Sequence, residues 1–276
     1  MPPHAFFLVS AVFHYLGPAF AVLLFGQVVP LGVAWLRIAG AAAVFAAWRR
    51  PWRACAGQPW AQRRTLLALG VVLGAMNGCF YLAIARLPLG TVGAIEFLGT
   101  LALAALGART RRNVLALALA VAGVWLLTDV RLAGRPIGFA FAFANCGLFM
   151  LYVILGHRIA RGGGGAGIDR LGAAMLVALL AISPFGLAGA AAAFTRPPLL
   201  LAGVGVGICS SVIPYVCDQL AMARLPRATF ALLLALLPAS ATVVGVVVLR
   251  QIPAPAEVAG VALVVGGVAV HRERGA

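Results

Sequence analysis

The sequence contains no lysine and only six acidic residues, and charged residues make up 10% of its 276 positions. Such a chain has too little polar surface to cover a water-soluble globule, so a soluble fold is excluded. Without a lysine there is no P-loop for coupling to ATP. The sequence also lacks HExxH and GxSxG motifs and an Asp-rich pair, so we predict that the protein is not an enzyme.

Cysteines are few and their spacing is not that of a metal site. The five cysteines include no CxxC pair, and four of them fall inside apolar runs. We interpret them as small packing residues and predict no metal, no disulfide set and no cofactor. The net charge is +15, but no basic tail and no basic face interleaved with aromatics occurs, so no nucleic-acid partner is expected.

Long apolar runs dominate the chain, which is 63% hydrophobic with a mean hydropathy of +1.06. Runs near 20 residues cross a hydrocarbon core of about 30 Å as helices, and they exceed the roughly 9 to 11 residues of a membrane strand. We therefore predict an all-α membrane protein with ten transmembrane helices that lies in the lipid bilayer. The expected spans are residues 5–25, 30–48, 65–85, 89–107, 113–129, 136–156, 171–194, 199–222, 228–249 and 255–271.

The arginines in the connections between these spans are unevenly divided. Connections on one side, together with the C-terminal tail, hold fifteen of them, and connections on the other side hold five. Cytoplasmic loops of membrane proteins carry the excess of basic residues. Both termini are therefore predicted to be cytoplasmic.

A short pattern repeats at half the chain length. Residues 81–88, YLAIARLP, resemble residues 219–226, QLAMARLP, at an offset of 138 residues. Each half holds five expected spans, an odd number, so the second half starts from the opposite side and the halves lie inverted. We predict two such units, residues 1–134 and 135–276. Inverted repeats are typical of secondary transporters, whose substrate site lies near the midplane.

Three polar side chains share one layer of the expected bundle. Arg37 and Glu96 each lie seven residues inside their spans, about 10 Å from the outer face, and Asn77 lies at about 12 Å. A zwitterion needs both charge signs, so we expect Glu96 to hold an ammonium group or a coupling proton. Arg37 or Asn77 would then hold a carboxylate. The alternative is a structural Glu96–Arg37 ion pair that only locks two helices.

Further polar side chains within spans are candidates for the same lining. Tyr81 shares a helix face with Asn77, and His14 lies mid-span, where a histidine can change its charge near neutral pH. Each of these alone is more often a packing or helix-to-helix hydrogen-bonding residue. Asp218, near the cytoplasmic end of the eighth span, is expected to form an interfacial ion pair or gate with Arg224. The remaining candidates are Asn145, Ser211 and Tyr215.

Three segments carry a resemblance to a known family. They are GVAWLRIAGAAAVFAAWRRPWR (32–53), MNGCFYLAIARLPLGTVGAIEFLGTLALA (76–104) and SSVIPYVCDQLAMARLPRATFALLLALLPASATVVGVVVL (210–249). In order and spacing they resemble the EamA-type drug/metabolite transporter superfamily, most closely its threonine/homoserine exporter branch. The resemblance extends over essentially the whole chain.

The resemblance implies a ten-helix bacterial inner-membrane permease of two inverted five-helix repeats. Its small-molecule substrate would be a small amino acid such as threonine or homoserine, or a related metabolite, moved out of the cell. A permease of the same fold for another metabolite or a cationic drug is the alternative. Such proteins commonly have a Glu-Pro pair in the ninth helix and a Gly-Glu pair after it. This sequence has Leu237-Pro238 and Arg250-Gln251, so these positions supply no carboxylate.

Overall fold

The computed structural model describes residues 3–52, 58–107, 110–129, 136–160, 164–225, 230 and 236–270. These residues form helices joined by short connections, and none of the described residues lies in a β-strand. The elements are α1 (Pro3–Leu23), α2 (Pro30–Arg49), α4 (Trp60–Ile84), α5 (Leu89–Gly107), α6 (Arg111–Asp129), α7 (Pro136–Ala160), α8 (Gly164–Gly186), η1 (Ala188–Ala190), α9 (Ala191–Phe194), α10 (Pro197–Gly207), η2 (Ile208–Val212), α11 (Ile213–Met222), α13 (Leu236–Leu249) and α14 (Pro255–Val270).

Six helical segments among the described residues are long and apolar enough to cross a membrane. They are Phe6–Leu23, Pro30–Arg49, Trp60–Ile84, Pro136–Ala160, Gly165–Gly186 and Pro197–Met222. This confirms the expected all-helical class with several spans. Helices α5, α6, α13 and α14 lie in the other expected ranges, with shorter apolar stretches such as Leu89–Gly99 and Pro255–Gly267.

Parts of the sequence predictions lie outside the described residues. These parts are residues 228–229 and 231–235 of the ninth expected span, the last residue of the tenth, and several of the arginines from which the membrane orientation was predicted. The arginines are Arg53, Arg109, Arg131, Arg135, Arg161, Arg227, Arg272 and Arg274.

The structure corrects the seventh expected span, residues 171–194. Helix α8 covers Gly164–Gly186, and the chain continues beyond it as the short helices η1 and α9. The early start is held by Asp169, whose Oδ1 accepts a hydrogen bond from Arg49 Nε at 2.6 Å. Pro184, which has no N–H to donate, lies two residues before the helix ends. The length of an apolar run predicts neither the hydrogen bond of Asp169 nor the residue at which α8 ends.

The exterior of the bundle is apolar, as expected of a protein surrounded by lipid. Its exposed large side chains include Trp125, Leu180, Leu201 and Val247, each 72 to 74% exposed. Polar side chains such as Arg37 are instead among the buried residues. This distribution is the reverse of a soluble protein and agrees with the low content of charge.

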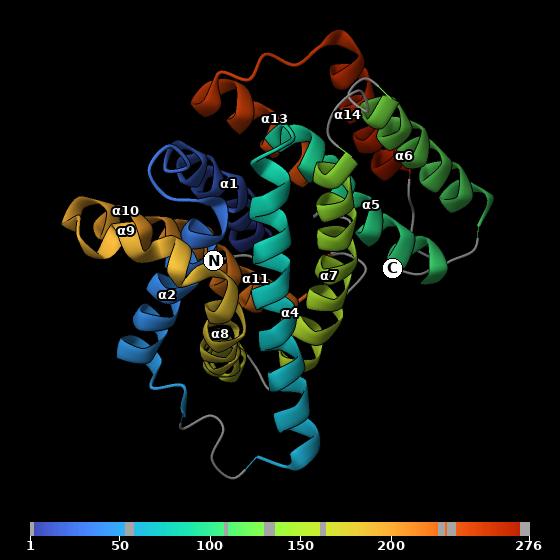
Figure 1. Ribbon diagram of the computed structural model, residues 1–276. Coiled ribbons are helices and arrows are strands. Elements are labelled where there is room, and N and C mark those ends of the chain that lie inside the picture. The colour runs from blue at the N-terminus through green and yellow to red at the C-terminus, as the bar shows by residue number, and fades with distance from the viewer. Residues whose placement is uncertain are drawn as a thin grey trace.

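The helices pack so that α1 and α4 lie near the centre. Figure 1 shows α4 running alongside α7, with α2 and α8 to one side and α5, α6 and α14 to the other. Helix α4 packs on both α7 and α8, α2 packs on α8 and α10, and α1 packs on α11 and α13. Helix α5 contacts α7 and α13, and α6 contacts α14. The buried faces of these helices form one continuous apolar core around a polar centre.

Candidate functional site

Six helical elements bring polar side chains to one buried cavity. The elements are α1, α2, α4, α5, α7 and α11. The cavity has a volume of about 10 Å³, room for about one water molecule, so this conformation is closed around it. Six of the nine predicted site residues line it. The lining consists of His14, Arg37, Met76, Asn77, Phe80, Glu96, Asn145 and Tyr215.

Arg37 is fastened to an irregular turn in the helix opposite. Residues Ile208–Val212 (η2) form a π-helical turn between α10 and α11, here called the π-turn. Arg37 Nη2 donates to the carbonyl oxygen of Ser210 at 2.6 Å, and its Nε donates to Ser211 Oγ at 2.8 Å. A longer bond joins Nη2 to the hydroxyl of Tyr215 at 3.3 Å. The guanidinium therefore fixes α2 against the π-turn.

The sequence explains why this carbonyl is available. In a regular helix the carbonyl of Ser210 would accept the N–H of residue 214, which is a proline and has no N–H. A π-turn at such a position is a common way to accommodate the irregularity, and π-turns occur often at functional sites. Arg37 supplies the donor that Pro214 lacks.

The close approach of α2 to α10 depends on a glycine. A Cβ atom at Gly207 would lie 2.6 Å from the carbonyl oxygen of Arg37, which is shorter than real contacts allow. Gly203 and Gly207, four residues apart on one face of α10, thus permit this close crossing. Without it, the Arg37 side chain would not reach the π-turn.

The positive charge of Arg37 has no acidic partner among the residues that the structure describes. Its side chain is 3% exposed, and the rings of Tyr81 and Tyr215 face the guanidinium at 5.6 and 5.9 Å. Neutral oxygens and aromatic faces stabilise a buried cation only in part. An arginine in this state attracts a carboxylate, with which it forms charge-assisted hydrogen bonds.

Glu96 faces the same cavity from α5 and is held weakly. Its Oε1 lies 3.7 Å from His14 Nε2, and its Oε2 accepts a hydrogen bond from the Tyr15 hydroxyl at 3.4 Å. Both contacts are long for hydrogen bonds to a carboxylate. The carboxylate is 3% exposed, so a closer cationic partner or a proton would stabilise it.

The structure contradicts the alternative in which Glu96 and Arg37 form an ion pair with each other. Glu96 contacts His14, and Arg37 contacts the π-turn. The two charges line one cavity while each is held by a different helix. Their separation leaves both available to a ligand that carries the opposite charges.

Asn145 adds an unsatisfied amide to the cavity. Its side chain is 1% exposed, and within the described part of the chain neither its Oδ1 nor its Nδ2 has a hydrogen-bond partner. Burial of an unpaired amide costs about 1–3 kcal/mol. Such an amide in the wall of a cavity is prepared to bind a polar ligand group.

The other predicted residues on α4 and in the π-turn support the wall of the cavity. Asn77 Nδ2 donates to the carbonyl oxygen of Leu73 at 2.8 Å, one helical turn away, which orients its amide. Tyr81 is fully buried beside Arg37 but does not line the cavity. Ser211 also does not line the cavity, and its hydroxyl accepts the hydrogen bond from Arg37.

The expected ion pair of Asp218 with Arg224 does not occur among the described residues. Its side chain is 2% exposed and accepts hydrogen bonds from Ser10 Oγ at 2.5 Å and from the Tyr152 hydroxyl at 2.9 Å. Arg224 instead places its guanidinium 5.1 Å from the centre of the Phe6 ring. Asp218 is therefore an interior carboxylate, because two hydroxyl donors from α1 and α7 replace the arginine.

Sequence reasoning missed the hydroxyl groups that contact the two carboxylates. Tyr15 bonds Glu96, while Ser10 and Tyr152 bond Asp218. One signal was available, because Ser10 and His14 are four residues apart and share a face of α1. That face meets both carboxylates.

The lining of the cavity is suited to binding a small polar ligand. Among the described residues, no group of three His, Cys, Asp or Glu side chains could hold a metal ion. A carboxylate with a histidine beside it, a cation without an acidic partner and a free amide together complement a small zwitterion.

Comparisons with known proteins place this geometry in context. No protein-family model matches the chain. The chain is 33% identical over 245 residues to the threonine/homoserine exporter RhtA of Escherichia coli (strain K12), covering 87% of this chain and 80% of that protein. The protein of the same name from Salmonella typhimurium (strain LT2) is 32% identical, covering 85% and 79%. A solved crystal structure with 21% identity matches with a TM-score of 0.63 over 96% of each chain, so the fold is shared.

Proposed function

This chain belongs to the EamA-type drug/metabolite transporters, in the branch of the threonine/homoserine exporters, and we propose that it exports a small amino acid such as threonine or homoserine. It does so as a secondary transporter, without converting its substrate. The observation that carries the proposal is the cavity that contains Glu96, Arg37 and Asn145 and has no ion pair between the two charges.

In this proposal each charged end of the amino acid has its own partner. Glu96, next to His14, receives the ammonium group or a coupling proton, and Arg37 receives the carboxylate. Asn145 binds a polar group of the substrate, such as a side-chain hydroxyl. The buried Arg37 disfavours the alternative substrate, a purely cationic drug, because among the described residues no acidic partner neutralises this arginine.

The cavity of about 10 Å³ is too small for an amino acid, so transport requires the helices around it to move. The π-turn is the proposed point of movement, because a carboxylate on Arg37 competes with Ser210 and Ser211 for the same donors. Release of these bonds allows α11 to shift relative to α2. Alternation between two access states is how secondary transporters with paired halves operate.

We propose that the ten helices form two inverted units, residues 1–134 and 135–276. The pattern of helix contacts supports this arrangement. Exchange of the halves converts the contact of α4 with α7 into that of α11 with α1, and the contact of α4 with α8 into that of α10 with α2, and both partners occur. The repeated RLP sequence after α4 and α11 marks equivalent connections.

We also propose that the protein is a multi-pass protein of the bacterial inner membrane with both termini in the cytoplasm. The six apolar segments support a multi-pass protein. The arginine bias of fifteen to five supports the orientation.

Growth and efflux measurements test the proposed function. Expression in a cell that lacks its own amino-acid exporters should raise tolerance to toxic concentrations of threonine or homoserine. Collapse of the proton gradient should remove that tolerance. A panel of competing solutes in vesicles then separates amino acids from other metabolites and cationic drugs. Unchanged tolerance, with the protein present in the membrane, contradicts the proposal.

A further inference from the structure

Two apolar side chains face the buried cavity among its polar ones. Of the described residues that line it, Met76 and Phe80 are the apolar ones. Both come from α4, four residues apart, so they lie on one face of that helix. The two residues are 4% and 5% exposed. The cavity therefore combines polar groups from several helices with one apolar wall, which belongs to α4.

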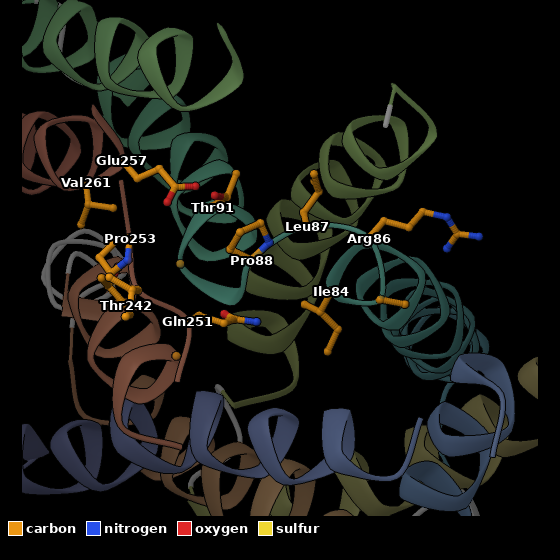
Figure 2. Close-up of a pocket in the computed structure, with 14 residues that line it drawn as sticks. Ile84, Arg86, Leu87, Pro88, Thr91, Thr242, Gln251, Pro253, Glu257 and Val261 are labelled. Atoms are coloured by element: carbon orange, nitrogen blue, oxygen red, sulfur yellow. The ribbon is translucent and has the colours of Figure 1, made fainter. Parts of the chain in front are cut away.

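The same face of α4 continues into a second and larger cavity, shown in Figure 2. This cavity has a volume of about 400 Å³ and is formed by the connection between α4 and α5, by α13 and by the start of α14. Ile84 lines it and lies four residues after Phe80, about 6 Å along the helix axis. Along α4, the wall of the buried cavity thus ends at Phe80 and that of the larger cavity begins at Ile84.

The ring of Phe80 is braced by two tyrosines. Its centre lies 6.4 Å from that of the Tyr15 ring and 6.0 Å from that of the Tyr81 ring, and both tyrosines are fully buried. A Cβ atom at Gly93 would lie 3.0 Å from the Tyr15 hydroxyl oxygen, so α5 packs tightly against this tyrosine. Aromatic contacts of this kind favour defined ring orientations. Phe80 is therefore a fixed part of the wall.

Met76 is the adaptable part of the same wall. A methionine side chain is unbranched and has three rotatable bonds, so it changes shape at little cost. The cavity of about 10 Å³ is closed in this conformation, and a substrate needs more room. Rotation of the Met76 side chain supplies part of that room without a change in the helix backbone.

We propose that Met76 and Phe80 determine which amino acids the protein exports, and that Phe80 limits the length of the substrate side chain. The inference rests on the proposed function. The charged ends of amino acids are alike, so their proposed partners, Glu96 and Arg37, do not distinguish one amino acid from another. An apolar wall does, because one methylene in such a pocket changes the preference by about 10- to 200-fold.

The position of Phe80 between the two cavities strengthens this role. In the proposed orientation the larger cavity lies on the outer side, so an exported amino acid passes Phe80 as it leaves the buried cavity. The larger cavity falls within the range of small-molecule sites, roughly 300–1,000 Å³, and has room for amino acids longer than threonine. Selection by length therefore belongs to the buried cavity and its wall.

Efflux of two amino acids from vesicles tests the wall. Vesicles that contain the full chain are loaded with labelled threonine or labelled leucine, and the two initial rates are compared. Phe80→Leu shortens the wall and keeps it apolar, so the ratio of leucine to threonine efflux should rise about tenfold or more. Phe45→Leu makes the same change at a buried phenylalanine of α2 outside both cavities. It is the matched control and should keep the wild-type ratio.

Met76→Ile tests the adaptable part. A β-branched side chain is stiff in a helix, so threonine efflux should fall by about three- to tenfold while the ratio of leucine to threonine stays at the wild-type value. Met175→Ile on α8, at a fully buried methionine outside both cavities, is the control and should export threonine normally. Normal efflux by Met76→Ile would remove Met76 from the proposal.

Two results would overturn the role of Phe80. One is normal threonine efflux by Phe80→Leu with an unchanged ratio. The other is an equal rise of the ratio in Phe45→Leu, which would reflect a general loosening of the helices. If Phe80→Leu does not reach the membrane, Phe80→Met stays closer to the original volume and should raise the ratio in the same direction. Failure of the proposed function is distinct, because the wild-type chain would then export neither amino acid.

Discussion

Two of the buried carboxylates in the described part of the chain, Asp218 and Glu96, differ in how well they are satisfied. Asp218 accepts hydrogen bonds at 2.5 and 2.9 Å from two hydroxyl groups and does not line the buried cavity. Glu96 has contacts at 3.4 and 3.7 Å and does line it. Both contact the same face of α1, through Ser10 for Asp218 and His14 for Glu96. Helix α1 thus connects a tightly held carboxylate to a loosely held one.

We propose that this difference separates a structural charge from one that binds a ligand. A carboxylate with two short charge-assisted bonds has little to gain from a further partner. One with two long contacts gains much from an ammonium group or a proton. Burial alone does not distinguish the two, because both residues are almost fully buried.

Replacement of Glu96 by Gln tests the loosely held carboxylate. The variant keeps the shape and loses the charge, so export should fall by about 10- to 100-fold or to background, while the amount of folded protein stays near wild type. Efflux of labelled threonine from loaded vesicles measures the loss. Asp169→Asn, a surface carboxylate paired with Arg49, is the control and should export normally. Full export by Glu96→Gln would remove Glu96 from the site.

Asn145→Leu should separate binding from stability at the same cavity. The change removes a buried amide that has no hydrogen-bond partner among the described residues, so the free energy of unfolding should rise by up to about 1–3 kcal/mol. Export should fall by about tenfold, because the substrate loses a polar contact. Thermal unfolding in detergent and vesicle efflux give the two values. A destabilised variant with normal export would show that the amide serves packing.

Asp218→Asn should show the opposite pattern. An amide cannot accept from both hydroxyl donors as the carboxylate does, so the free energy of unfolding should fall by about 1–3 kcal/mol. The protein that remains folded should retain more export activity than Glu96→Gln. Denaturation of the two variants side by side measures the difference. If Asp218→Asn is as stable as wild type but cannot export, the two carboxylates have the same role and the comparison fails.

The smallest effect is expected from Tyr15→Phe. The hydroxyl lies 3.4 Å from Glu96, and so long a bond contributes about 0.5 kcal/mol or less. Export should change by less than about threefold. Tyr152→Phe, which removes the 2.9 Å bond to Asp218, should lower the melting temperature more than Tyr15→Phe does. Equal losses in the two variants would mean that the distances do not report how tightly each carboxylate is held.

Much of the fold and part of the site were predictable from the sequence. The shared depth of Arg37, Asn77 and Glu96 followed from counting residues along helices, and the three line one cavity. The partners of Asp218 and Glu96 were not predictable. Hydroxyl donors come from helices far away in the chain, and the nearest arginine in sequence is a poor guide to the nearest donor in space.

The sequence by itself determined that the chain is a helical membrane protein, because its apolar runs have the length of membrane-spanning helices, which satisfy their own backbone hydrogen bonds in lipid. It also identified the few polar residues that lie within apolar spans. Only the tertiary structure decided that Arg37 contacts the π-turn and that Glu96 lies beside His14. The physical reason is that the pattern of apolar residues is read along the chain. Hydrogen-bond partners depend instead on which helix faces meet in space.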